Sequence, residues 1–259
     1  MNEFRQVPGW LTDPSHWSGA DGIPERVVQH LELSFIAILL ALLLAVPVGL
    51  WVGHRHRFEF AAVTAANAGR AVPSFALLVV VFILMLHVWP AIAFGPGPTV
   101  VVLTLLAIPS ILTNTYVGIQ SVDADAVEAA RGMGMRERQI LTRLEVPLAA
   151  PLMMTGIRTA TLQVIATATL AALIGGGGLG NFIVDGFAQG DTAMTIAGAM
   201  LVASLAVAVD FLLSLAERAV TPKTESGSRP RARIPLAALR RSARPQAEGA
   251  PYVPPTLPH

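Results

Sequence analysis

The chain has 259 residues, of which 53% are hydrophobic and only 14% are charged, and its formal net charge is +1. A soluble globular domain carries roughly a quarter charged residues, so this composition argues for an integral membrane protein. The absence of cysteine excludes disulfides, thiolate chemistry and cysteine-ligated metal sites.

Residues 1–27 are polar, contain three prolines and carry Trp10 and Trp17. They lack a basic start followed by an apolar run and a small-residue cleavage site, which argues against a cleaved signal peptide. Tryptophan combines an apolar ring with a polar N–H and therefore suits the membrane interface. We predict a short extracytoplasmic surface segment.

Five apolar stretches predict membrane-spanning helices, because about 20 residues at about 1.5 Å each cross a hydrocarbon core of about 30 Å. They cover residues 30–53, 58–89, 99–120, 148–174 and 192–216. Pro47 removes a backbone donor near the end of the first span and is expected to kink it. The second stretch is interpreted as one long span kinked at Pro73. Two separate segments fit the same residues, so the span count is five or six.

Residues 122–147 form the only long polar segment in the apolar middle of the chain. Asp125 and Glu128 have the spacing of a capping box, which predicts a helix start at this point. Gly134 can adopt the left-handed conformation that ends a helix. A second helical turn pattern follows, and we expect Pro147 to stop it.

Two charges lie inside predicted spans, Arg158 in the fourth and Asp210 in the fifth. Each is roughly two to three turns from the same end of its span. A charge in hydrocarbon is costly unless it has a partner, so we hypothesise that the two pair across the bundle. Alternatively, Arg158 snorkels while Asp210 meets lipid headgroups or the nearby Arg218.

The fourth span ends in a glycine run that is too flexible to hold as helix. We interpret this run as a gate or hinge, together with Pro73 at the break in the second stretch, and the alternative is a loose connecting loop. The glycines are Gly175, Gly176, Gly177, Gly178 and Gly180.

Residues 222–259 carry eight of the 19 prolines and a basic cluster. Such a segment cannot bury enough apolar surface to offset its ordering entropy, so we predict a disordered tail. Its cations suit anionic lipid headgroups or a cytoplasmic partner.

Lysine and arginine are segregated among the loops. With five spans, residues 54–57 (His-Arg-His-Arg), the loop at 122–147 and the tail share the basic side, and the loops at 90–98 and 175–191 contain no lysine or arginine. The positive-inside rule then places the tail in the cytoplasm and the N-terminus outside. His54 and its neighbours are interpreted as a positively charged interface anchor rather than metal ligands.

The loop at 122–147 resembles the cytoplasmic loop of permease subunits of binding-protein-dependent ATP-binding-cassette importers. The family pattern is Glu-Ala-Ala, three residues, Gly, nine residues and then Ile-x-Leu-Pro, and here Leu144 and Val146 are conservative departures from it. In that family the loop forms a coupling helix that docks on the ATPase. Alternatively, a polar loop between membrane helices folds as a short amphipathic interface helix. The implied coupling residues are Asp125, Glu128, Ala129, Ala130, Gly132, Met133, Gly134, Leu144 and Pro147.

Other segments resemble the osmoprotectant permeases that take up glycine betaine, choline, carnitine or proline betaine. They include residues 71–74 (AVPS), 156–160 (GIRTA) and 168–180, which ends in the glycine run. The resemblance covers residues 28–217 and implies an all-α type I importer transmembrane domain in the inner membrane of a prokaryote.

The family implies four kinds of partner: ATP-binding-cassette ATPase subunits, a second permease that is identical or related, an extracytoplasmic solute-binding protein and the lipid bilayer. The chain has no G-x-x-x-x-G-K-[ST] loop, so we expect ATP and magnesium to be bound by the ATPase partner. We expect no metal site and no nucleic-acid partner. Asn114, Tyr116 and Gln163 are candidates for lining the solute pathway, and packing groups are the alternative.

Two other functions fit parts of the sequence. The first is an importer of the same architecture whose cargo is an amino acid or another small organic solute. The second is an ion-coupled carrier, which predicts inverted repeats with broken helices near the membrane midplane. No such repeat is visible, and a carrier would leave the coupling pattern unexplained.

Overall fold

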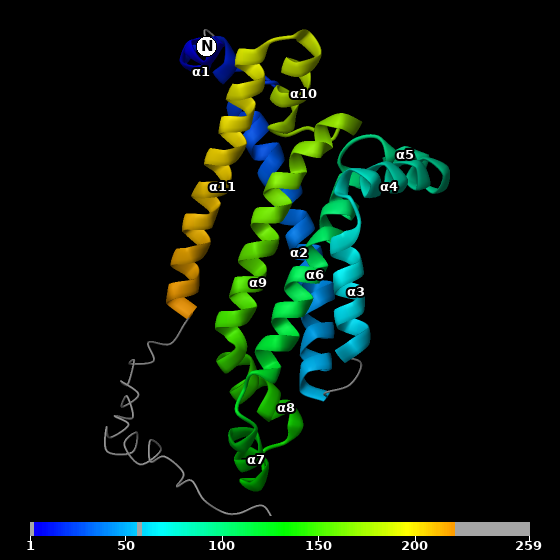
Figure 1. Ribbon diagram of the computed structural model, residues 1–259, viewed down its shortest axis with the longest axis vertical. Coiled ribbons are helices and arrows are strands. Elements are labelled where there is room, and N and C mark those ends of the chain that lie inside the picture. Colours follow the sequence, from blue (N-terminus) through cyan, green and yellow to red (C-terminus); the bar gives the residue numbers. More distant parts are fainter. Residues whose placement is uncertain (1–2, 56–58, 221–259) are drawn as a thin grey trace, which may run out of the picture. The chain divides into compact units, whose positions relative to one another are not determined.

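The computed structural model describes residues 3–55 and 59–220, and every regular element in these ranges is a helix (Figure 1). This confirms the predicted all-α class. The predicted disordered tail, and His56 and Arg57 of the basic loop, lie outside the described residues.

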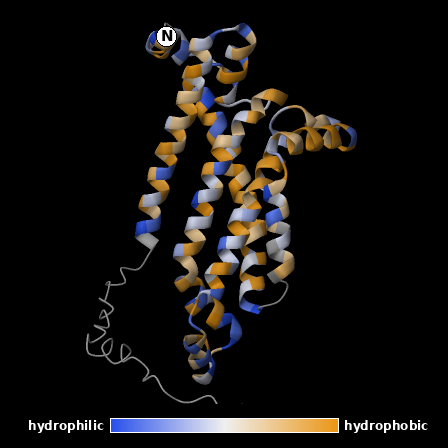
Figure 2. Cartoon of the chain, viewed as in Figure 1, coloured by the Kyte–Doolittle hydropathy of each residue, from blue (hydrophilic) through white to orange (hydrophobic). Residues whose placement is uncertain are grey.

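Four helical stretches are long and apolar enough to cross a membrane: Ile23–Arg55, Pro96–Gln120, Glu137–Ile174 and Thr192–Arg218. They correspond to α2 (Ile23–Arg55), α6 (Pro96–Gln120), α9 (Val146–Thr167) with its flanking turns, and α11 (Thr192–Val220). Hydrophobic residues cover most of their length (Figure 2). α2 begins before the predicted start of the first span at residue 30, and it continues through Pro47 to Arg55.

The second predicted span is two helices. α3 (Glu59–Ala71) and α4 (Ser74–Val88) are separated at Pro73, which occupies the N-cap position of α4. At about 1.5 Å per residue, α3 is about 20 Å long and is too short to cross a bilayer alone. Figure 1 shows α3 beside α6, with α4 and α5 (Pro90–Ala93) turned away at its end. The interpretation as one long kinked span is therefore wrong, and the alternative of two segments is confirmed.

α6 forms the centre of the bundle and packs against α2 on one side and α9 on the other. The shared core uses small residues such as Ala41 of α2, Ala107 of α6 and Ala160 of α9. Small residues let membrane helices approach closely. At Gly156 an added Cβ would lie 2.4 Å from the Asn114 Cβ, so only glycine allows this crossing of α6 and α9.

Short helices pack around one end of the bundle. α1 (Val7–Thr12) and α10 (Gly180–Gln189) contact α11. The Trp10 ring packs edge-on against Phe182 with centroids 5.4 Å apart and stacks on His16 at 4.1 Å. Trp10 therefore belongs to a protein core, whereas Trp17 is half exposed. We call this end the α10 end, and the opposite end the α7 end.

Candidate functional site

The loop that joins α6 to α9 begins with α7 (Ala124–Gly132). Its N-cap is Asp123, whose Oδ1 accepts a hydrogen bond of 2.9 Å from the Asp125 backbone N–H. The sequence pattern placed the cap at Asp125, and that prediction is wrong by two residues. Aspartate is among the best N-cap residues because its side chain satisfies one of the free N–H groups of the first turn.

Five of the predicted coupling residues form one exposed stripe along α7 and its C-cap. Their spacing of i, i+3, i+4, i+7 and i+8 puts them on a single helical face. Met133 at the end of the stripe is 77% exposed. The stripe consists of Asp125, Glu128, Ala129, Gly132 and Met133.

Ala130 lies on the opposite face of α7 and is only 3% exposed. It packs inside the chain, so it cannot contact a partner from this position. The expectation that Ala130 belongs to the docking surface is therefore wrong, because one helical residue beyond Ala129 turns the side chain by about 100°. A bulky residue at 130 would disturb the folding of α7, whereas one at 129 would alter its exposed surface.

A sharp corner connects α7 to α8 (Glu137–Ile140). Gly134 adopts a φ of +83°, which confirms the predicted left-handed conformation. Arg131 closes the corner by donating from Nε and Nη2 to the two Glu137 carboxylate oxygens, at 2.9 and 3.1 Å. This hydrogen-bonded carboxylate raises the pKa of Arg131 above its usual range, so the guanidinium stays charged.

His54, at the end of α2, ties the first membrane helix to this loop. Its Nδ1 lies 2.6 Å from the Glu145 Oε2, and its Nε2 lies 3.1 Å from the Glu137 Oε2. The side chains of His54 and Glu145 are only 8% and 7% exposed. A protonated imidazole donates from both nitrogens and can therefore bind both carboxylates at once. We call Arg131, Glu137, His54 and Glu145 the ionic clasp.

The interpretation of His54 as a lipid-interface anchor is wrong, because its side chain is buried against Glu145. The partner is 91 residues away along the chain, and no local pattern predicts the pairing. The only signal in the sequence is a histidine at the end of an apolar span and a glutamate at the start of another.

Pro147 does not stop the helix, contrary to prediction. α8 leads through a π-helical segment, η3 (Leu141–Glu145), directly into α9, in which Pro147 occupies the first turn. Proline is tolerated there because the preceding turn is π-helical: the Val146 N–H bonds the Leu141 carbonyl five residues back, so the regular i→i−4 pattern is already interrupted. Half-buried Leu144 lies in the π-helical segment, and such segments are frequent at functional sites.

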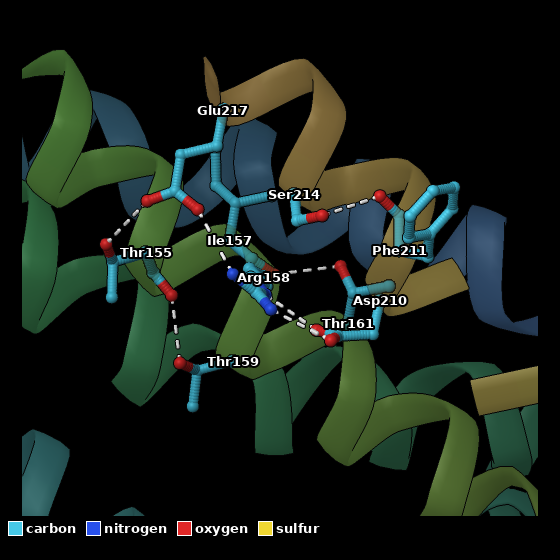
Figure 3. A network of polar contacts seen from close by, with 9 residues as sticks. All are labelled: Thr155, Ile157, Arg158, Thr159, Thr161, Asp210, Phe211, Ser214 and Glu217. Atoms are coloured by element: carbon cyan, nitrogen blue, oxygen red, sulfur yellow. Dashed lines mark hydrogen bonds and ion pairs between the residues drawn. The ribbon is translucent and has the colours of Figure 1, made fainter. Parts of the chain in front are cut away.

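Arg158 and Asp210 pair across α9 and α11, as hypothesised (Figure 3). Arg158 donates from Nε and Nη2 to the two Asp210 oxygens, at 2.6 and 2.8 Å, in a bidentate arrangement. Glu217 is a second partner, with its Oε2 3.3 Å from the Arg158 Nη1. Glu217 was not among the predicted residues, although its i+7 spacing from Asp210 places both on one helical face.

Two of the three predicted pathway residues pack within the described part of the chain. The Asn114 amide donates to the Ser110 carbonyl of its own helix at 2.8 Å. Tyr116 is buried at 7% exposure, and Gln163 is half-buried on α9. For Asn114 and Tyr116 the geometry favours the alternative of internal packing.

The glycine run forms a tight turn at the α10 end. α9 continues as a 3₁₀ helix, η4 (Ala168–Ile174), and three of the following glycines have φ between +75° and +86°. An added Cβ at Gly180 would lie 2.1 Å from the Thr169 carbonyl oxygen, so α10 approaches η4 at its backbone. We call residues 175–178 the glycine turn.

Comparison with known proteins gives consistent matches along most of the chain. Residues 29–222 match the family described as "Binding-protein-dependent transport system inner membrane component". The glycine betaine/carnitine/choline transport system permease protein OpuCB of Bacillus subtilis is 38% identical over 77% of this chain and 88% of that protein. The osmoprotectant import permease protein OsmW of Salmonella typhimurium is 36% identical over 75% of this chain and 90% of that protein.

Solved structures share the fold. A chain of the inward-facing MetNI methionine ABC transporter matches with a TM-score of 0.69 and 22% identity, over 81% of this chain and 99% of that chain. A chain of an amino acid ABC transporter crystallised with histidines matches with a TM-score of 0.61 and 15% identity, over 85% and 98% of the two chains. The described helices therefore have the fold of a type I importer transmembrane domain.

Proposed function

Because the chain belongs to the family of binding-protein-dependent transport system inner membrane components, we propose that it is the permease of an ATP-driven importer for a small osmoprotectant. The cargo proposal rests on one observation. Permeases named for glycine betaine, carnitine and choline, or for osmoprotectants, are 36–38% identical to this chain over 88–90% of their own length. Glycine betaine, choline, carnitine and proline betaine are the candidate solutes.

The exposed stripe on α7 is the proposed docking surface for an ATPase subunit. Its alanine and glycine allow close approach, and Met133 supplies an adaptable apolar contact. Displacement of α7 would reach α2 through the ionic clasp, because Arg131, Glu137, His54 and Glu145 connect four segments. It would reach the glycine turn through the continuous helical stretch Glu137–Ile174.

We place the α7 end in the cytoplasm and the N-terminus outside, in the inner membrane. The distribution of arginines among the described residues supports this orientation under the positive-inside rule. The α7 end carries Arg55, Arg131, Arg136, Arg138, Arg143 and Arg218, whereas the α10 end carries Arg5 and Arg26. Alkaline phosphatase fused after Val220 should be inactive, and activity would contradict the orientation.

The remaining partners and ligands of the proposed importer are those that membership of this family implies. An extracytoplasmic solute-binding protein would deliver solute at the α10 end, and a second permease would complete the pathway. ATP and magnesium would be held by the ATPase subunits, which supply the hydrolysis that this chain converts into helix movement.

Uptake measurements test the cargo proposal. Labelled glycine betaine, choline and carnitine should accumulate at high osmolarity in cells that lack other osmoprotectant uptake and express this chain with its ATPase and binding protein. The same cells with Ala129→Trp should insert the chain but take up about tenfold less solute. Uptake of an amino acid and of none of the three osmoprotectants would overturn the cargo and retain the importer.

A further inference from the structure

The segment before the glycine turn has an unusual backbone. η4 continues as a 3₁₀ helix for seven residues, Ala168–Ile174. Runs of 3₁₀ helix longer than about three to four residues are uncommon, and within a longer helix they often mark a hinge. The glycine turn follows at once, with Gly175, Gly177 and Gly178 at positive φ. The regular α-helix α9 therefore gives way at Ala168 to two successive irregular segments, first η4 and then the glycine turn.

His30 of α2 holds the side of this hinge that precedes η4. Its ring is completely buried, and its Nε2 lies 2.9 Å from the carbonyl oxygen of Ile165 in the last turn of α9. A carbonyl oxygen can only accept, so Nε2–H is the donor. The contact joins residues 135 positions apart and fixes the end of α9 on α2.

Gln29, the preceding residue, holds the other side. Its Oε1 accepts from the backbone N–H of Gly178 at 3.2 Å, and also from the Arg26 Nη1 at 3.0 Å. An added Cβ at Gly177 would lie 2.8 Å from this oxygen, so the turn lies directly against Gln29. Two adjacent residues of α2 thus contact the chain on both sides of η4.

The two contacts differ in how readily they can break. The His30 contact is fully buried inside the bundle, whereas the Gln29 contact is a single, partly buried hydrogen bond between neutral groups. A second acceptor also faces the turn. The His30 Nδ1 has no hydrogen-bond partner within the described part of the chain, and an added Cβ at Gly178 would lie 3.0 Å from it. With a small shift of the turn, the Gly178 N–H could therefore exchange the Gln29 Oε1 for the His30 Nδ1 as its acceptor.

We propose that η4 and the glycine turn are the hinge of the outer gate, with His30 as the anchor of its fixed side and Gln29 as the releasable latch of its moving side. This inference rests on the proposed permease function and adds two positioning residues to it. Opening breaks the Gly178–Gln29 hydrogen bond and leaves the His30–Ile165 contact intact.

A cysteine reporter tests the latch, because the chain has no cysteine of its own. Leu179 follows the glycine turn and is completely buried, so Leu179→Cys should react slowly with a membrane-impermeant maleimide in the assembled importer. Gln29→Met removes the acceptor at similar size and should raise the labelling rate about fivefold, the equivalent of one neutral hydrogen bond. Gln29→Glu keeps an acceptor oxygen and should stay within about twofold. Gln189→Met, at an exposed glutamine of α10, should label at the parent rate.

Uptake tests the anchor. His30→Leu removes the donor to Ile165 and should lower uptake at least about tenfold at equal membrane abundance. His30→Gln places an amide N–H near the position of Nε2 and should restore uptake to within about threefold of the parent. Parent-rate labelling of Gln29→Met would overturn the latch, and a His30→Gln defect equal to that of His30→Leu would overturn the anchor. Labelling requires no cargo, so a wrong solute assignment would not alter it.

Discussion

The two ends of the bundle are held together by different chemistry. At the α7 end, the ionic clasp links α2, α7, α8 and η3 through four ionisable side chains at distances of 2.6 to 3.1 Å. At the α10 end, neutral contacts hold the glycine turn: Gln29 accepts from Gly178, and the backbone of α10 lies against η4.

This difference suits different tasks. Hydrogen bonds between charged groups are stronger and more directional than neutral ones, so the clasp can transmit a displacement without slipping. A neutral contact to a glycine turn breaks at lower cost and leaves no charge unpaired. Under the proposed mechanism, the α7 end would transmit force and the α10 end would open.

The largest effect is expected at the junction of α9 and α11, where Arg158 pairs with Asp210 and Glu217. Arg158→Asp would bring a third carboxylate beside Asp210 and Glu217 and should lower uptake about 100-fold, because unpaired charges in the membrane are costly. The double variant Arg158→Asp with Asp210→Arg should recover part of the uptake. An equally inactive double variant would count against pairing as the reason for the defect.

Breaking the clasp should have the next largest effect. Glu145→Leu leaves His54 without its buried acceptor and should lower uptake about 30-fold while the chain still inserts. Glu145→Gln retains an acceptor oxygen for the His54 Nδ1–H and should be clearly milder. If the leucine and glutamine variants transport alike, the clasp does not transmit movement.

A bulky substitution on the exposed stripe of α7 tests the proposed docking surface. Ala129→Trp should lower uptake about tenfold, the usual cost of overpacking a close contact, and should weaken ATPase co-purification with the permease. Thr142→Trp, at an exposed position of η3 outside the stripe, is the matched control and should transport normally. Normal uptake and ATPase co-purification by the Ala129→Trp variant would show that the docking surface lies elsewhere.

The smallest effects come from two glycines that form a matched pair across the two ends. Gly134 and Gly175 have φ of +83° and +75°, and an added Cβ meets nothing within 4 Å at either. Alanine should therefore impose the same backbone cost of about 1 kcal/mol at both positions. Gly134→Ala should reduce uptake about threefold without altering Leu179→Cys labelling, and Gly175→Ala should alter the labelling rate. If Leu179→Cys labelled at the same rate in the Gly134→Ala and Gly175→Ala variants, the proposed difference between the α7 end and the α10 end would be wrong.

Sequence reasoning succeeded where a feature is local. Apolar length located four of the five passages, although α2 begins seven residues before the predicted start, and Gly134 was assigned its left-handed conformation. The pairing of the two intramembrane charges, 52 residues apart, was predicted from the cost of an unpaired charge in hydrocarbon and not from a local pattern. It failed at Asp125 and Pro147, where a cap two residues earlier and a π-helical segment fit the same residues equally well.

By itself, the sequence determined the helical class, the order of the passages and the position of the polar loop at 122–147, because hydrophobic length and turn residues are encoded locally. Only the tertiary structure decided that Ala130 faces inward, that α3 and α4 separate, and that His54 and His30 reach Glu145 and Ile165. The physical reason is that lipid is as apolar as a packed interior. Periodicity therefore cannot tell which face of a membrane helix packs, and contacts across 91 and 135 residues emerge only when the helices assemble.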